Sequence, residues 1–286
     1  MNLLVPIIIL IAFLFGIVCL FRLLSKKRNA TKRKLLDLKV GFVNEMLSEI
    51  FEDVEYNAKR CIDIQTMRDA ELIDGWDRFT ESSAFDTTLD FTGSDYFKGK
   101  YKGCEVECCD FGVTKITKKT ETDSDGKVTE RKEYELLFKG QWMICKLRKP
   151  VPHKVRIREA ADRATLSPLR LFAGDQSRVK KGDVETENAA FNAKFQILGD
   201  GHSAFLILTP HFMEFVLSAD SKADGRTMLC FWDDRVHIAI FNRRDLFEVK
   251  RKKEQKNIPA LKERLKGELK YLTDILDELF QNDNLF

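Results

Sequence analysis

The chain of 286 residues is 44% hydrophobic and 33% charged, with a net charge of +3 at pH 7. This composition excludes a disordered or collagen-like chain. The charge is uneven, because residues 1–39 hold eight of the 48 basic residues and one of the 45 acidic residues. Residues 40–286 therefore carry 40 basic and 44 acidic side chains, a net charge of −4. Nucleic-acid binding requires a basic face on the folded domain, so we expect no nucleic-acid partner.

Residues 1–24 have the composition of a transmembrane anchor. Leu3 to Leu24 contains one charged residue, Arg22, in an otherwise apolar run. About 20 helical residues cross a hydrocarbon core roughly 30 Å thick, so this run spans a bilayer once. A cleaved signal peptide would carry basic residues before its apolar core, and none precede this run. We predict an uncleaved single-pass anchor in the plasma membrane.

The basic linker at 25–34 predicts the orientation of this anchor. Its basic residues lie close to the membrane end of the apolar run, where the positive-inside rule applies. We therefore expect the N-terminus outside and the main body of the chain in the cytoplasm. The same side chains are candidate contacts with anionic headgroups, at about 1 kcal/mol each, unless they serve as a topology signal alone. They are Lys26, Lys27, Arg28, Lys32, Arg33 and Lys34.

Seven scattered cysteines argue against a disulfide scaffold, which shows an even and dense set. We expect mostly buried thiols in a reducing cytosol. Cys104, Cys108 and Cys109 in "CEVECC" invite a zinc interpretation, but structural zinc requires a second cysteine pair that this chain lacks. Alternation along a strand would instead bury one set of these thiols. We predict no metal and no cofactor.

The fold class that we predict is α+β. Apolar residues recur every three or four positions over 35–73, which predicts a long amphipathic helix within a helical segment at 35–80. Residues 81–97 have the composition of an irregular connection. Gly93, Gly99 and Gly103 lack the context of a phosphate-binding loop and would permit bends there.

An antiparallel β-rich domain with short helices is predicted over 91–249. Runs at 101–119 and 127–149 are rich in β-forming residues and flank the turn sequence "TDSDG", which predicts a hairpin. The first half of residues 121–132 resembles a twelve-residue calcium-binding loop. Their twelfth position is Lys132, where calcium requires a bidentate glutamate, so we favour a hairpin tip. Residues 153–159 could form a further strand.

The second half of this domain alternates short elements. Residues 185–198 suggest a short helix running into a strand, and 202–208 suggest a buried strand. Thr209 can cap a helix that begins at Pro210. Residues 227–241 predict a strand, a tight Asp-Asp turn and a second strand, and the two turn carboxylates, Asp233 and Asp234, would be solvated.

A C-terminal amphipathic helix is predicted at 257–281, where leucines recur every three or four residues. This apolar stripe and the one at 36–61 could pair with each other, with the β domain, or with a second copy of the chain. We therefore expect a protein partner or a homo-oligomer formed through the amphipathic helices, besides the lipid bilayer itself.

The stretch 197–215 concentrates the candidate catalytic groups, which are Asp200, His202 and His211. A nucleophile and its base must lie within about 3 Å, with a third group to orient the base. The spacing here predicts a turn, a strand and a helix entrance instead. We therefore assign no catalytic residue from the sequence.

Residues 91–249 resemble a bacterial family of single-span membrane proteins known only as domain of unknown function thirty-one thirty-seven. Four segments carry the resemblance: "DYFKGKYKG", "LFKGQWMICKL", "VETENAAFNAKFQIL" and "HSAFLILTPHFMEFVL". The resemblance implies a membrane-anchored α+β domain. It implies no activity, substrate or catalytic residue.

The function that we expect is a membrane-anchored binding or scaffold domain facing the cytoplasm, and not an enzyme. One alternative is a lipid- or envelope-responsive sensor that uses two basic patches, at 26–34 and 250–256. A second alternative is a membrane-associated enzyme with a polar site around 199–211.

Overall fold

The computed structural model describes residues 22, 25–26, 39–73, 76, 87–122, 128–159, 183–222, 225–248, 257–282 and 285–286. The chain forms two compact units, Met1–Glu45 and Met46–Phe286. The elements of the second unit are β1 (Glu52–Asn57), α2 (Ile64–Asp69), β2 (Thr87–Tyr101), β3 (Cys104–Thr122), β4 (Val128–Glu159), α4 (Ala189–Lys194), β5 (Phe195–Gly199), α5 (Gly201–Ile207), α6 (Pro210–Lys222), β6 (Arg226–Phe241) and α7 (Ile258–Leu279).

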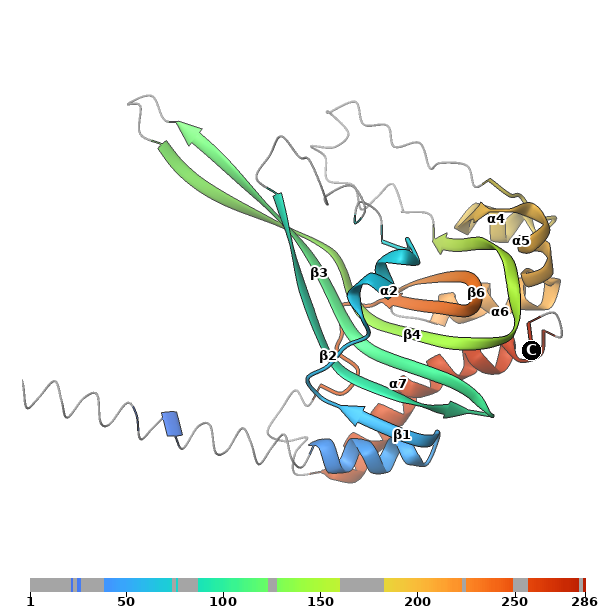
Figure 1. Cartoon of the computed structure of the whole chain (residues 1–286), viewed down its shortest axis with the longest axis horizontal. Coiled ribbons are helices and arrows are strands. Elements are labelled where there is room, and N and C mark those ends of the chain that lie inside the picture. Colours follow the sequence, from blue (N-terminus) through green and yellow to red (C-terminus); the bar gives the residue numbers. More distant parts are fainter. Residues whose placement is uncertain are drawn as a thin grey trace, which may run out of the picture. The chain divides into compact units, whose positions relative to one another are not determined.

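The strands form one antiparallel sheet in which β4 has the most partners. Neighbouring strands follow the order β1-β2-β3-β4-β5, and β6 pairs with β4. The middle of β4 pairs with the second half of β6, from Gly140↔Phe241 to Lys146↔Arg235. The last part of β4 pairs with the first half of β6, up to Arg158↔Met228. As Figure 1 shows, β6 turns back on itself and β4 curves around the outside of this turn.

The curve of β4 lies at two prolines. Pro150 and Pro152 have no N–H to donate, so they cannot continue a ladder of hydrogen bonds. The pairing with β6 shifts register between Lys146 and Val155. Nearby backbone N–H groups of Arg148 and Lys149 instead donate to the carbonyl of Leu285, at 3.1 and 3.0 Å. The C-terminal residues thus satisfy donors that the bend removes from the sheet.

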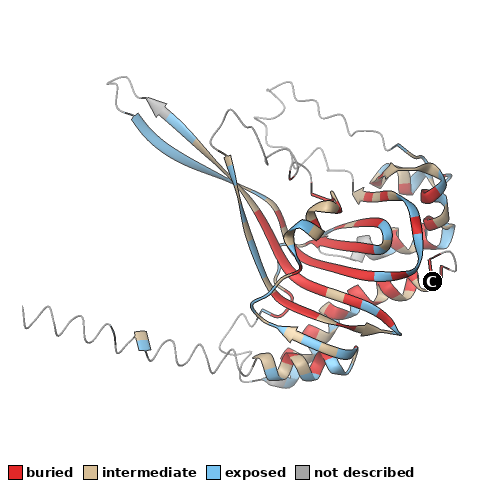
Figure 2. Cartoon of the chain, in the orientation of Figure 1, coloured by how far each residue is buried: buried red, intermediate tan, exposed pale blue. Residues whose placement is uncertain are grey.

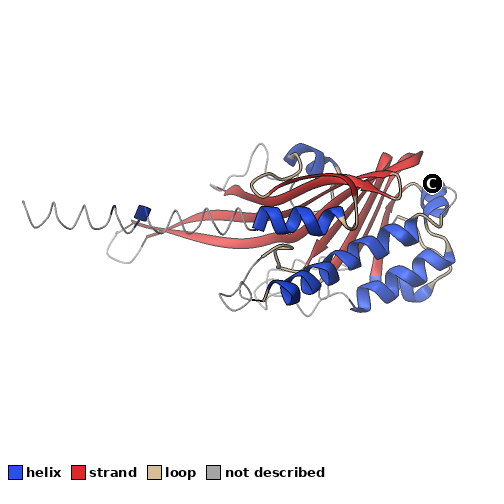
Figure 3. Ribbon diagram, turned by 90° about the horizontal axis from the view of Figure 1, so that it is seen from below, coloured by secondary structure: helices blue, strands red, loops and turns tan. Residues whose placement is uncertain are grey.

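Helices cover both faces of the sheet, α2 on one and α7 on the other (Figure 3). Helix α7 is attached to the sheet by a hydrogen bond between Thr227 and Tyr271 at 2.8 Å. An ion pair between Lys102 and Asp277 at 2.6 Å attaches it to the β2–β3 turn.

The face of the sheet covered by α2 carries an aromatic core. Its buried members are Ile62, Met67, Ala70, Leu72, Ile73, Trp76, Tyr96, Cys109, Phe111, Val113, Phe138, Trp142, Ile144, Cys230, Ala239 and Phe241.

The leucine stripe of α7 is buried within the chain itself, as the red inner side of this helix shows in Figure 2. A protein partner or second copy stays a prediction, and it would contact other surfaces. One exposed surface is the outer part of the β3–β4 hairpin, where Tyr134 is 66% exposed and Val128 60%. The buried stripe consists of Leu261, Leu265, Leu269, Leu272, Leu276 and Leu279.

The predicted antiparallel domain with short helices is confirmed. Strands β3 and β4 pair antiparallel from Val106↔Cys145 to Thr122↔Val128, so the described residues on either side of 123–127 form the predicted hairpin. Residues 153–159 are the last part of β4, α4 runs directly into β5, and β6 contains the Asp-Asp turn. Helix α6 begins at Pro210, and the Thr209 hydroxyl accepts from Phe212 N at 3.2 Å. The C-terminal amphipathic helix is α7.

The long helix predicted over 35–73 is wrong. Residues 39–48 are helical, but the chain then turns into β1, which pairs antiparallel with β2, and continues to α2. Two local features are incompatible with one continuous helix: Asp53 has a left-handed φ of 51°, and Asp63 caps a new helix by accepting from Thr66 N at 2.9 Å. The apolar residues in this range fit one face of a helix, but they also fit β1, where alternate side chains are partly buried.

The irregular connection predicted at 81–97 is wrong from Thr87 onward, where β2 begins, and residues 81–86 lie outside the described residues. Two positions in β2 require glycine because neighbouring atoms lie too close for a side chain, and not because the chain bends there. A Cβ on Gly93 would lie 2.5 Å from Cys61 Cβ, and one on Gly99 would lie 2.9 Å from the Glu52 carbonyl oxygen. Only Gly103, with φ of 79°, lies at a turn.

The buried strand predicted at 202–208 is a helix instead. Asp200 accepts from Ser203 N at 2.9 Å and caps α5. Ser203, Ala204 and Ile207 are its buried residues, a three- and four-residue spacing that fits one helical face. The local N-cap therefore decided between two structures that an apolar run alone does not distinguish.

The predicted membrane anchor lies outside the described residues, apart from Arg22 at its end. Among the residues that the structure describes, no helix is both long and apolar enough to cross a membrane.

We predict that G93A destabilises the fold by roughly 1–3 kcal/mol, because the new methyl group overlaps the Cys61 side chain. The matched control is G267A in α7, where a Cβ meets nothing within 4 Å. That change should stabilise the chain by roughly 0.5–1 kcal/mol. Urea midpoints measure both, and equal midpoints for the two variants would contradict the assignment.

A second prediction concerns Asp110, whose carboxylate accepts from Leu246 N at 2.9 and 2.8 Å. Burial raises the pKa of this carboxyl from 3.8 to about 8. The folded chain therefore keeps a proton that the unfolded chain releases, and this contribution to stability falls as pH rises from about 4 to 8. D110N retains the shape of the neutral acid without titrating.

Between about pH 5 and pH 7.5, the free energy of unfolding of the parent chain should fall relative to that of D110N. Urea unfolding of both chains at the two pH values measures this difference, and other titrating groups cancel in the comparison. A pH dependence that is the same in both chains would show that Asp110 does not hold this proton.

Candidate functional site

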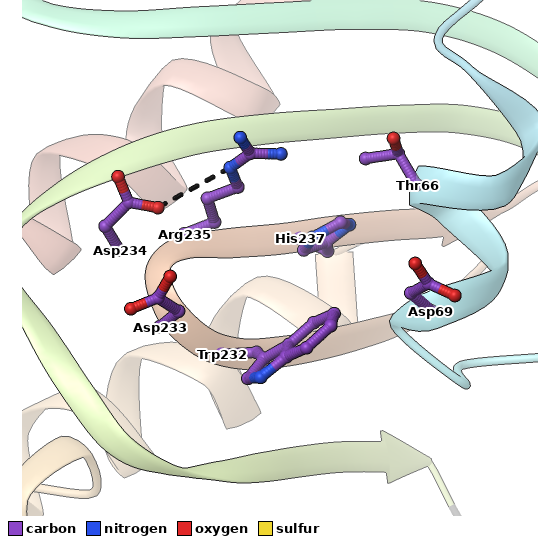
Figure 4. Close-up of a pocket in the computed structure, with 7 residues that line it drawn as sticks. All are labelled: Thr66, Asp69, Trp232, Asp233, Asp234, Arg235 and His237. Atoms are coloured by element: carbon purple, nitrogen blue, oxygen red, sulfur yellow. Dashed lines mark ion pairs between the residues drawn. The ribbon is translucent and has the colours of Figure 1, made fainter.

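A pocket of about 210 Å³ lies between α2 and the turn of β6. We refer to it as the α2–β6 pocket. Figure 4 shows side chains from both elements around it. The described residues that line it are Thr66, Asp69, Trp232, Asp233, Asp234, Arg235 and His237.

Local structure places these side chains. The Asp63 cap starts α2, so Thr66 and Asp69, three residues apart, lie on one side of this short helix. On the other wall, Asp233 adopts a φ of 53°, the left-handed conformation that aspartate tolerates in tight turns. The turn brings Trp232 and His237, from the two halves of β6, to the same pocket.

His237 supplies a buried donor to the pocket. The side chain is only 2% exposed, and its Nδ1 accepts from Trp142 Nε1 at 3.3 Å. Because an indole N–H only donates, Nδ1 must be unprotonated and the proton resides on Nε2. Burial lowers the pKa of His237 from 6.5 to about 4. The ring is therefore neutral at pH 7, and no described residue accepts its Nε2–H.

Trp232 forms an aromatic wall that is 41% exposed. The ammonium of Lys154 lies 4.2 Å from the centroid of its ring. Lys154 also donates to the carbonyl of Asp69 at 2.7 Å and to Glu71 at 3.0 Å, and Arg156 bonds Glu71 at 2.6 Å. These contacts join the end of α2 to β4 and fix the two walls relative to each other.

The charges around the pocket divide into paired and unpaired groups. Asp234 lies 3.5 Å from Arg235 and 3.8 Å from Lys146. Asp69 accepts from the neutral amide of Gln65 at 2.6 Å. Within the described part of the chain, neither Asp69 nor Asp233 forms an ion pair with a basic side chain. The pocket thus contains two carboxylates available to a cation.

The candidate groups of 197–215 have other roles. Asp200 caps α5, and the hydrogen bond from Ser203 N is the main cause that lowers the pKa of its carboxyl. His211 is an exposed side chain of α6 that pairs with Glu278 of α7, and His202 is exposed on α5. None of the three lines the α2–β6 pocket.

The cysteines of "CEVECC" are all buried, on both faces of β3. The prediction that one set would be buried is too narrow, because helices cover both sides of the sheet. Burial raises the pKa of the Cys108 and Cys109 thiols, and Cys109 Sγ accepts from Ile62 N at 3.4 Å. The six described cysteines are free thiols. Among the described residues, no group of three or more potential ligands could hold a metal ion.

Of the predicted membrane-surface contacts, Lys26 is described and exposed. Lys27, Arg28, Lys32, Arg33 and Lys34 lie outside the described residues, as does the second basic patch at 250–256.

The sequence does not predict the α2–β6 pocket. Asp233 and Asp234 were predicted to be solvated turn residues, and α2 was assigned to a long helix. One signal was available: His237 lies between Val236 and Ile238 in an apolar strand, and a buried histidine needs a hydrogen-bond partner.

The fold and the pocket define an antiparallel β-rich domain with several short helices and a polar pocket on its sheet. Residues 136–280 match the family described as "Protein of unknown function (DUF3137)". This is half of the chain, and the chain belongs to that family. No curated protein matches the chain, and no solved structure matches it. The matched region contains β6 but not α2, so it supplies one wall of the pocket.

We predict that His237 remains the neutral Nε2–H tautomer at pH 7 and titrates near pH 4, because it is buried and Trp142 donates to Nδ1. Nitrogen NMR of histidine-labelled chain measures the tautomer. W142F removes the donor and should let both tautomers populate. W232F is the matched control, since Trp232 lines the pocket without bonding Nδ1. A tautomer unaffected by W142F would refute this account.

Proposed function

We propose that this chain is a binding module held at the inner face of a bacterial plasma membrane by its N-terminal apolar segment. The apolar run at 3–24 and the basic residues after it support the anchor and its orientation. Six free thiols in the described chain are consistent with a reducing compartment. The ligand site of this module is the α2–β6 pocket.

The fixed hydrogen-bond donor of His237 carries the proposal of binding. A general acid or base works best with a pKa near the operating pH, whereas the pKa of His237 is about 4. Its Nδ1 is also committed to Trp142. A neutral ring with one fixed N–H directed into a pocket is suited to recognise an acceptor on a ligand.

The anchor and its orientation are tested by labelling with a membrane-impermeant maleimide. T129C adds a thiol at an exposed position of β4. We expect T129C to react only after bacterial cells are opened, whereas N2C should react in intact cells. The chain without an added cysteine is the control, since the described native thiols are mostly buried.

Three results would contradict the proposed function. Labelling of T129C in intact cells would reverse the orientation. A mature chain lacking its first 24 residues, seen by mass spectrometry, would remove the anchor. Turnover of a phosphoester, peptide or glycan by the full chain would make the protein an enzyme.

A further inference from the structure

The α2–β6 pocket contains both acceptors and donors of hydrogen bonds. Asp69, on α2, and Asp233, at the β6 turn, are carboxylates without a described cationic partner. Arg235 contacts Asp234 through Nε at 3.5 Å. In Figure 4 its two terminal nitrogens point away from Asp234, and the ring of His237 lies between Arg235 and Asp69.

The His237 donor requires an acceptor. The imidazole is 2% exposed and lines the pocket, and no described residue accepts from its Nε2–H. Because this N–H faces the pocket, water or a ligand accepts from it. An anionic oxygen would accept from His237 and from the Arg235 guanidinium together.

We propose that the α2–β6 pocket binds a short zwitterion, a primary ammonium joined through a few atoms to a carboxylate or phosphate. The ammonium would bond the Asp69 carboxylate, and the anionic group would bond Arg235 and the His237 N–H. This inference rests on the proposed function, since it names the ligand class of the same pocket.

Size and charge both favour a small zwitterion. Pockets for drug-sized ligands measure roughly 300–1,000 Å³, and this pocket measures about 210 Å³. An anion alone would face the Asp69 and Asp233 carboxylates, which have no cationic partner among the described residues. A simple cation would face Arg235 and offer no anionic acceptor to the His237 N–H. A ligand with both charges places an ammonium at Asp69 and an anionic oxygen at Arg235 and His237.

The test uses the full chain, purified in detergent, with glycine, β-alanine and phosphoethanolamine as probes. Trp232 is the exposed tryptophan of the pocket, while Trp76 and Trp142 are buried. Binding should therefore shield Trp232 from acrylamide quenching and shift the His237 Nε2–H resonance. Ethylamine and acetate, each with one charge, should bind at least about tenfold more weakly than the best zwitterion.

Variants identify the groups that bind each charge. D69N keeps an oxygen for Gln65 but loses the charge, and R235Q loses the guanidinium. Each should weaken binding of the best zwitterion about tenfold or more. The matched controls are D274N, on the opposite face in α7, and R131Q, on the exposed β3–β4 hairpin, and both should bind like the parent chain.

The outcomes separate this inference from the proposed function. If acetate or ethylamine binds as well as any zwitterion, the zwitterion inference is overturned and the pocket is still a binding site. If no probe shields Trp232 or shifts His237, the inference fails, while maleimide labelling still decides the anchor. Tighter binding of phosphoethanolamine would identify a lipid headgroup as the source, and tighter binding of glycine or β-alanine a free amino acid.

Discussion

The bend in β4 is the constraint on which the rest of the domain depends. Two prolines interrupt its ladder, and the strand returns to pair with β6 a second time. Both outer edges of the β6 turn are thereby hydrogen-bonded, and its tip cannot shift along either one without breaking pairs. The turn at Asp233 is consequently held in a fixed position opposite α2. A pocket can form there because one wall is part of the sheet.

Register also fixes the polar pair inside the aromatic core. Trp142 lies opposite Ala239, and His237 lies opposite Ile144. A slip of one residue would turn His237 to the α7 face and leave the Trp142 indole without its acceptor. The hydrogen bond between these two rings thus specifies the pairing of β4 with β6. The same bond determines which nitrogen of His237 carries the proton, so fold and site depend on one contact.

Much of the fold could be predicted from local signals. The β3–β4 hairpin, the Thr209 cap and the α7 stripe each have a strong turn, capping or periodic pattern. The errors came where two structures share one pattern. Val54 fits a helical face and also a covered strand, and 202–208 is apolar in a strand or a helix. The pocket was not predictable, since α2 and β6 are more than 150 residues apart and only the tertiary fold joins Asp69 to His237.

The two walls of the pocket have different origins in the chain. The region matched to the family, 136–280, supplies Arg235 and His237, while α2 lies before it and supplies Asp69. The α2 wall is attached through Lys154 and Arg156, which bond Glu71 just after the helix. Side chains on α2 can therefore change without disturbing the pairing of β4 and β6. Arg235 and His237 belong to the sheet, whereas Asp69 on α2 can vary independently of the strand pairing.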